Sequence, residues 1–90
     1  MPHVRFTSAL QRFFPTLVDG HFEGKTVADV LTQVEKRFPG LSDYLTDERG
    51  ALRKHVNVFI GTRMIQDRTR LSDGLADDAE VCIFQALSGG

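Results

Sequence analysis

The stretch "TVADVLTQVEKRFPG", residues 26–40, decides the fold because it carries the clearest helix signal in the chain. Thr26 is a favourable N-cap residue, and Asp29 three positions later completes a capping-box pattern. Pro39 and Gly40 then end the helix. The apolar residues fall at i, i+3, i+4, i+7 and i+11, which is one face of a helix; they are Val27, Val30, Leu31, Val34 and Phe38. The pattern predicts a helix over about 27–38 that buries one face on a sheet.

The segments before this helix predict a strand pair. "HVRFT", residues 3–7, alternates polar and apolar side chains and is typical of a half-buried strand. "TLVDGHFEG", residues 16–24, is expected to be a second, irregular strand with a bulge or bend at Gly20. The intervening "SALQRFFP", residues 8–15, is too short for a confident helix, and we interpret it as a wide hairpin connection.

The segments after the helix predict the rest of the sheet. A connector over residues 41–54 contains a short helical turn, and "HVNVFI", residues 55–60, is the clearest strand. "RMIQD", residues 63–67, is expected to be a short edge strand. "EVCIFQA", residues 80–86, is apolar on both faces, so we place it centrally, beside the first strand.

This order of elements predicts an α+β fold of the β-grasp (ubiquitin-like) type. A mixed sheet of four or five strands has one main helix packed on one face, since a single helix covers only one side of such a sheet. Residues 1–86 are expected to form this domain, and residues 87–90 a flexible C-terminal tail that ends in Gly-Gly.

The composition excludes several functional classes. The chain has 90 residues, 41% of them hydrophobic, and a formal net charge of −1, so neither nucleic acid nor a membrane surface is an expected partner. It has no apolar run long enough to span a bilayer and no evident targeting segment, so we expect a cytoplasmic protein. Its single cysteine, Cys82, permits no internal disulfide.

The sequence offers no catalytic or metal-binding constellation. The histidines are scattered, without HxxxH or CxxC spacing, and no serine has a nucleophile-elbow context. We therefore expect no bound metal, no bound cofactor and no enzymatic activity of the chain's own. Cys82 lies between Val81 and Ile83 in a strand and is expected to be buried and structural.

Two aromatic residues suggest a docking surface. If Val58 and Ile83 face the helix, Phe59 and Phe84 lie on the opposite face, which no helix covers. They are either ordinary surface aromatics or the centre of an apolar docking patch. Arg5 and Asn57 would border that patch.

The chain ends in "LSGG". Two glycines at the end of a sequence are either an unstructured end without a function or a segment that the function requires. Together with "TVADVLTQVEKRFPGL", "HVNVFI" and "LADDAEVCIF", this ending resembles the ThiS/MoaD ubiquitin-like sulfur carriers, most of all the CysO-type carriers and small archaeal-type modifiers. Asp77 and Val81 match the D-G-D-x-V element that precedes the last strand in that family. Asp78 and Ala79 replace its glycine and second aspartate.

The resemblance implies a mechanism centred on the last residue. A ubiquitin-activating-type enzyme would adenylate Gly90 with ATP, and a sulfur donor would convert the adenylate into a thiocarboxylate. Gly89 would give clearance in the partner's channel, and Leu87 and Ser88 would complete the tail. ATP and any metal would belong to the partner.

The resemblance also implies a downstream sulfur-accepting synthase, in cysteine, methionine, thiamine or molybdopterin synthesis or a related route. A JAMM-type metalloprotease is a further partner that the resemblance implies. Two alternatives stay open: a ubiquitin-like modifier conjugated to lysines through Gly90, and a β-grasp interaction domain that needs no tail chemistry.

Overall fold

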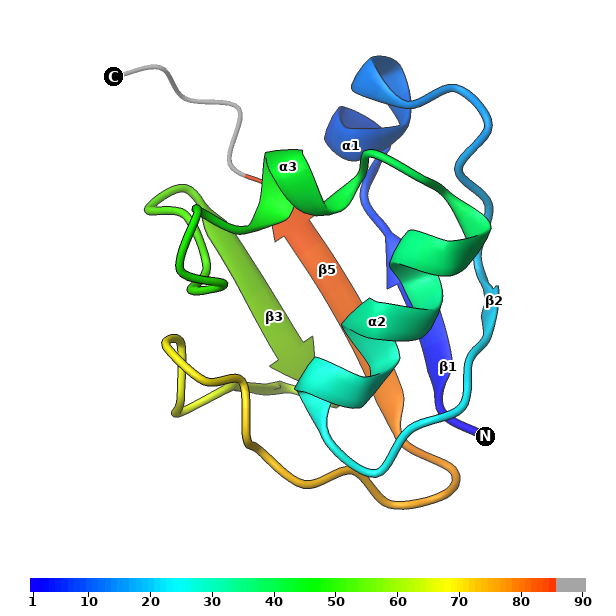
Figure 1. The fold of residues 1–90 in the computed structure, drawn as a ribbon. Coiled ribbons are helices and arrows are strands. Elements are labelled where there is room, and N and C mark those ends of the chain that lie inside the picture. Colours follow the sequence, from blue (N-terminus) through cyan, green and yellow to red (C-terminus); the bar gives the residue numbers. More distant parts are fainter. Residues whose placement is uncertain (86–90) are drawn as a thin grey trace.

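The computed structural model describes residues 1–85. Within that range the chain forms three helices and a five-stranded sheet (Figure 1). The strands are β1 (His3–Phe6), β2 (Gly20–His21), β3 (Val56–Ile60), β4 (Arg63–Met64) and β5 (Glu80–Gln85), and the helices are α1 (Ser8–Phe13), α2 (Val27–Arg37) and α3 (Ser42–Leu45).

The strand order, β2-β1-β5-β3-β4, places the last strand in the middle of the sheet. β5 runs parallel to β1 and antiparallel to β3, so the sheet is mixed. A parallel neighbour at one edge of β5 and an antiparallel one at the other is the β-grasp arrangement. The predicted fold class and the central position of the last strand are therefore confirmed.

Helix α2 forms where the sequence pattern places it. The hydroxyl of Thr26 accepts a hydrogen bond from the backbone N–H of Asp29 at 3.2 Å, as an N-cap should. The Asp29 carboxylate accepts from the backbone N–H of Lys25, one residue earlier than a capping box requires. The helix ends at Arg37, and Gly40 follows with φ +99°, a conformation that favours glycine.

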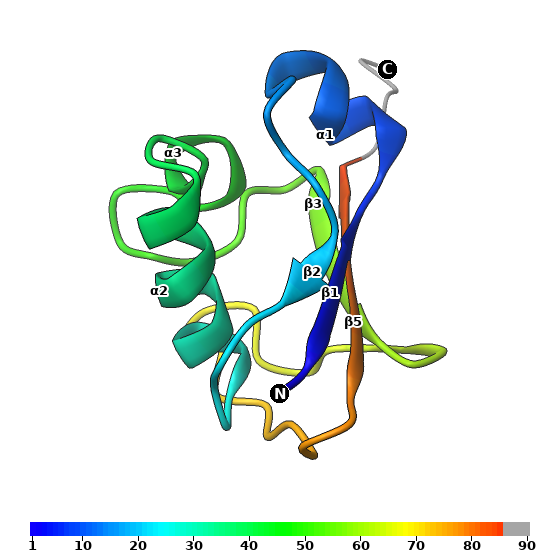
Figure 2. The same cartoon turned by 90° about the vertical axis from the view of Figure 1, so that its right-hand side faces the viewer.

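The hydrophobic core lies between α2 and one face of the sheet (Figure 2). Val30 and Val34 of the helix pack towards Val58 and Ile83 of the two central strands, and all four are at most 1% exposed. Residues before and after the helix close the core; they include Leu10, Leu17, Phe22, Leu41, Leu45 and Leu71. One helix and one sheet face thus supply about half of the buried apolar side chains, and the segments around them supply the rest.

Residues 8–15 do connect the antiparallel pair β1 and β2, but the expectation that they form no helix is wrong, because residues 8–13 form helix α1. The Thr7 carbonyl accepts hydrogen bonds from the backbone N–H groups of Leu10 and Gln11, which starts the helix. Ala9 and Leu10 are buried, and α1 contacts β5 at one end of the sheet (Figure 1). A six-residue helix has little stability of its own, so this packing determines it.

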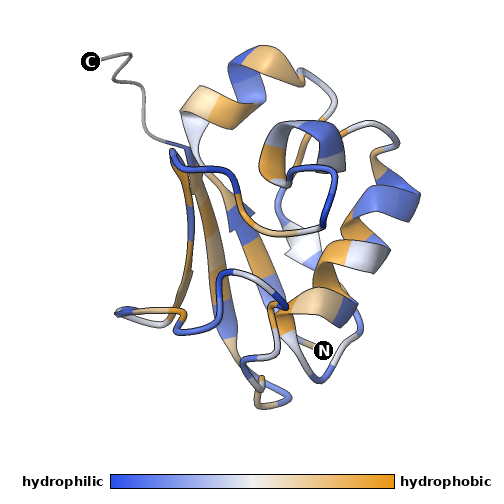
Figure 3. Ribbon diagram, turned by 60° about the vertical axis from the view of Figure 1, so that its left-hand side comes forward, coloured by the Kyte–Doolittle hydropathy of each residue, from blue (hydrophilic) through white to orange (hydrophobic). Residues whose placement is uncertain are grey.

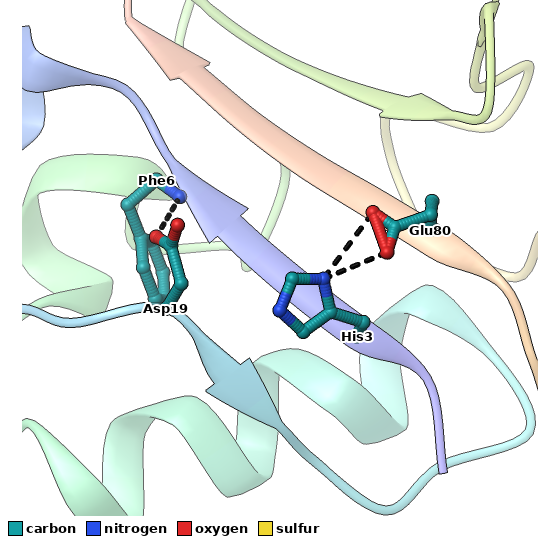
Figure 4. Close-up of polar contacts among 4 residues, drawn as sticks. All are labelled: His3, Phe6, Asp19 and Glu80. Atoms are coloured by element: carbon teal, nitrogen blue, oxygen red, sulfur yellow. Dashed lines mark hydrogen bonds and ion pairs between the residues drawn. The ribbon is translucent and has the colours of Figure 1, made fainter.

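The long second strand expected over residues 16–24 is also wrong. Only Gly20 and His21 pair with β1, and Gly20 lies opposite Val4 in regular register rather than in a bulge. Beyond this pair the Asp19 carboxylate accepts the backbone N–H of Phe6 at 3.0 Å (Figure 4). A side chain thus replaces the missing strand partner at this edge of β1.

The parallel contact between β1 and β5 is reinforced by a side-chain pair. His3 and Glu80 lie opposite each other in register, and His3 Nδ1 is 2.7 Å from Glu80 Oε1 (Figure 4). Both side chains are partly exposed, so this pair contributes little to stability. The pair lies at the start of β5, five residues before the end of the described chain.

Candidate functional site

The sheet face opposite α2 is the candidate site, and no helix covers it (Figures 2 and 3). In register, Phe84 of β5 lies opposite Asn57 of β3, and Cys82 lies opposite Phe59. On the other side of β5, Arg5 of β1 lies opposite Cys82. Opposed residues in a sheet share a face, so these five side chains form one surface, here called the open face.

The exposure of these residues matches that placement. Along β5, Val81 and Ile83 are buried while Phe84 is 39% exposed, and along β3, Val58 is buried while Phe59 is half-buried. Neither ring belongs to the core under α2. The predicted position of both phenylalanines is therefore confirmed, whereas their role in docking stays a prediction.

Asn57 forms a side-chain hydrogen bond within the domain that the sequence did not predict. Its Oδ1 accepts a hydrogen bond from the guanidinium of Arg68, and the same guanidinium donates to the backbone carbonyl of Arg53 at 2.8 Å. Arg68 thus brings a positive charge to the edge of the open face. Asn57 acts there as an anchor for that guanidinium.

Met64 is a member of the open face that the sequence analysis did not single out. It lies opposite Phe59 in the β3–β4 hairpin and is 47% exposed. The edge strand over 63–67 was predicted, so counting the register through the Gly61–Thr62 turn would have placed Met64 beside Phe59. A flexible thioether next to two aromatic rings is a common composition for a contact surface.

Cys82 departs from its predicted burial. It is half-buried in the middle of the open face rather than buried in the core. Desolvation is the main influence and raises the pKa of the thiol, while the positive charge of Arg5 acts in the opposite direction. A raised pKa means less thiolate at neutral pH, so this environment makes the thiol a weak nucleophile.

The tail residues named above, Leu87, Ser88, Gly89 and Gly90, lie outside the described residues, as does the domain boundary at residue 86. What the structure places is the strand that leads to them. β5 ends at Gln85, directly after Phe84 of the open face. The exposed ring is therefore close in sequence to the tail.

The described part of the chain contains little else that could perform chemistry. Within residues 1–85 no three His, Cys, Asp or Glu side chains gather as metal ligands would. No helix in that range is long and apolar enough to cross a bilayer.

The family assignment follows from a match along almost the whole chain. The model of the ThiS family matches residues 7–90, which include the open-face residues of β3 and β5 and the final Gly-Gly, but not Arg5. This chain belongs to the ThiS family. The resemblance inferred from the sequence is confirmed.

Characterised relatives in the family carry two kinds of name. The sulfur carrier protein CysO of Mycobacterium tuberculosis is 29% identical over 69 residues, which cover 74% of each chain. Small archaeal modifier protein 3 of Haloferax volcanii is 32% identical over 65 residues, covering 72% of this chain and 70% of the relative. The relatives that match thus include one named as a sulfur carrier and one named as a small archaeal modifier protein.

Solved structures show the same fold. The Amycolatopsis orientalis BexX/CysO complex contains a chain with a TM-score of 0.84 and 22% identity, with both chains covered completely. Mycobacterium tuberculosis CysO has a TM-score of 0.82 at 22% identity, covering 97% of this chain and 100% of that one. At these identities the likeness establishes the β-grasp fold and nothing finer.

Proposed function

We propose that this chain is a sulfur carrier whose sulfur is held as a thiocarboxylate on Gly90. The observation that carries the proposal is the family match over residues 7–90, which runs through the diglycine at the end of the sequence. The relative named as a sulfur carrier aligns with three quarters of the chain.

The proposed chemistry has two steps, both in the active site of a partner. A carboxylate oxygen of Gly90 attacks the α-phosphorus of ATP, and pyrophosphate leaves, which gives an acyl-adenylate. A hydrosulfide-equivalent donor then attacks the acyl carbon, and AMP leaves with the C–O bond electrons. A carboxylate is a poor electrophile, so the adenylate supplies the leaving group that the second step needs.

The two glycines suit this chemistry physically. Without Cβ atoms, Gly89 and Gly90 can pass through a channel too narrow for other residues and can adopt φ values that other residues avoid. The folded domain then supplies affinity that a tail alone lacks. We assign this docking to the open face, with Phe84 and Phe59 at its centre and Arg5 at its border.

The proposed partners are an adenylating enzyme of the ubiquitin-activating type, a sulfur donor and a sulfur-accepting synthase. The solved complex of BexX with CysO supports the idea that proteins of this fold dock onto a partner. A protein of this size offers a surface adequate for one standard interface beside its tail. We further propose that the protein works in the cytoplasm.

Intact mass spectrometry after incubation with ATP, sulfide and the adenylating partner tests the proposal. The expected product is heavier by the exchange of one oxygen for sulfur, and alkylation with iodoacetamide should label it in a Cys82→Ala background. Deletion of Gly89 and Gly90 should abolish the product, and Gly90→Ala should fold normally but charge poorly. Full charging of the truncated chain would overturn the proposal.

The 32% identity to a small archaeal modifier favours a second candidate, conjugation of Gly90 to target lysines. Both functions share the adenylation step and differ only in the acceptor. Tryptic digests of cells that express the tagged protein separate them, because conjugation leaves a C-terminal remnant of this chain on lysines. A non-covalent interaction domain would give neither product and would tolerate loss of the diglycine.

A further inference from the structure

A groove on the side of the molecule opposite the open face has no role in the proposed function. It has a volume of about 600 Å³ and lies between α2, α3 and two loops that contain residues 49–50 and 69–71. Figures 1 and 2 show α2 and α3 on the same side of the sheet. Leu31 and Leu71, both nearly buried, contribute apolar surface to its lining. We call it the α2–α3 groove.

The lining of the groove is strongly cationic. Lys36, Arg49 and Arg70 contribute exposed side chains from three different segments. Among residues 1–85 none of these three side chains forms an ion pair, since the salt bridges there are Met1–Asp77 and His3–Glu80. Three cations therefore surround an apolar floor without a carboxylate partner in the described part of the chain.

The one carboxylate in the lining is already occupied. Glu35 Oε2 accepts the backbone N–H of Gly40, and Oε1 accepts that of Ser42, both at 2.8 Å. These two bonds fasten the end of α2 to the start of α3. Because both oxygens are used, Glu35 serves the fold and leaves the cations of the groove available to an outside ligand.

One wall of the groove is held in shape by an unusual backbone. Leu71 has φ 57°, and its carbonyl accepts the N–H of Ala28 in the first turn of α2 at 2.9 Å. The Asp67 carboxylate accepts the backbone N–H groups of Thr69 and Arg70, which fixes the preceding turn. Bonds to both ends of the segment hold a leucine in a conformation it rarely adopts. The groove is thus preorganised.

We propose that the α2–α3 groove binds an acidic peptide segment of a partner protein that carries an apolar side chain among its carboxylates. The apolar side chain packs on Leu31 and Leu71, and the carboxylates pair with Lys36, Arg49 and Arg70. Charge complementarity around an apolar floor defines this occupant. A nucleic-acid strand fits less well, because its bases would meet two aliphatic side chains where stacking needs aromatic ones.

The location of the groove has a functional consequence. Its lining shares no residue with the open face, and the core of the domain lies between the two surfaces. A partner on the groove and an adenylating enzyme on the open face could therefore bind together. The groove proposal goes beyond the proposed function and does not depend on it, because binding of a peptide needs no chemistry at Gly90.

Titration of the uncharged, ¹⁵N-labelled full chain with a short blocked peptide tests the proposal. In the peptide a central leucine is flanked on both sides by glutamate and aspartate. We expect saturable amide shifts on the groove segments, with a dissociation constant on the order of 0.1–1 mM that weakens with added salt. The matching peptide of leucine, glutamine and asparagine should bind at least about tenfold more weakly.

A pair of charge-matched triple variants locates the site. Lys36→Gln, Arg49→Gln and Arg70→Gln together should weaken peptide binding about tenfold or more. Arg12→Gln, Lys54→Gln and Arg63→Gln together make the same change in net charge on other exposed segments and should have little effect. Equal losses in both variants, shifts outside the groove, or tighter binding of a single-stranded oligonucleotide than of the peptide would each overturn the proposal.

Discussion

The two faces of β3 and β5 use one backbone for different purposes. On the covered face, Val58 and Ile83 have no exposed surface. On the open face their immediate neighbours Phe59 and Phe84 keep part of their rings in water. Adjacent residues of a strand point to opposite sides, so a single position separates a core side chain from a surface one.

This difference shows how a small domain can leave an apolar surface exposed while the opposite face of the same strands forms the core. Burial on the covered face is shared among α2, both central strands and the surrounding loops. The open face receives no helix, so its apolar side chains are available to partners. Substitutions on the covered face should therefore change the stability of the fold, and substitutions on the open face should change affinity for partners.

Ile83→Ala and Phe84→Ala should produce the largest contrast. Truncation of fully buried Ile83 is expected to reduce the free energy of unfolding by about 3 kcal/mol, from lost transfer free energy and a residual cavity. Phe84→Ala removes a larger side chain, yet it should cost about 1 kcal/mol or less because the ring is 39% exposed. Urea unfolding curves measure both values, and similar losses would contradict the division between the faces.

Phe84→Glu and Phe59→Glu should affect binding more than folding. A charge in the middle of an apolar contact is expected to weaken affinity for the adenylating partner about tenfold or more. The melting temperature should change little, because both positions border water. Phe13→Glu is the matched control, since Phe13 is 53% exposed on α1, away from the open face. Calorimetric titration measures the affinities, and equal losses in all three variants would remove the open face as the docking site.

The periodic patterns in the sequence predicted most of the difference between the covered face and the open face. The 3.6-residue repeat over 27–38 identified α2 and its buried side, and the two-residue alternation in "HVNVFI" and "EVCIFQ" assigned Val58 and Phe84 to opposite faces. These patterns are strong because a whole face must be apolar to be buried. They also predicted the open face, apart from Met64.

The sequence failed where tertiary contacts decide the structure. Helix α1 has only six residues, and its formation depends on the burial of Ala9 and Leu10 at the end of the sheet. β2 contains only two residues, because beyond them the Asp19 carboxylate, and not a strand carbonyl, accepts the backbone N–H of Phe6 in β1. Cys82 was wrongly expected to be buried, although the alternation in "EVCIFQ" places it on the same uncovered face as Phe84, where it is half-buried.

Asp67→Asn should have a smaller, pH-dependent effect confined to the covered side. Hydrogen bonds, first from the Arg70 N–H and then from the Ser72 hydroxyl, lower the pKa of Asp67 from 3.8 to about 2. Because the folded pKa is depressed, this stabilisation is present above pH 3.8 and is lost as the pH falls through 2. The melting temperature of the variant should be a few degrees below that of the wild type at neutral pH, and the two melting temperatures should become equal near pH 2.

Asp78→Asn is the control for that measurement, because Asp78 is exposed and accepts no hydrogen bond from residues 1–85. It should show no convergence, since no such network is lost on protonation. Melting temperatures of both variants and the wild type, measured between neutral pH and pH 2, check these expectations. An Asp67→Asn deficit that stays constant over this range would show that the turn depends on shape rather than on the charge of the carboxylate.

Cys82→Ala should have the smallest effect, although it removes the only thiol and lies in the centre of the open face. Its raised pKa makes the thiol a weak nucleophile, and under the proposed function the sulfur is carried on the Gly90 carbonyl. We expect charging within about twofold of the wild type and a stability change of about 1 kcal/mol or less. Charging followed by intact mass checks the first expectation, and thermal melting the second. Loss of thiocarboxylate in a folded Cys82→Ala protein would place the thiol on the route of the sulfur, and the open face would then take part in the chemistry as well as in docking.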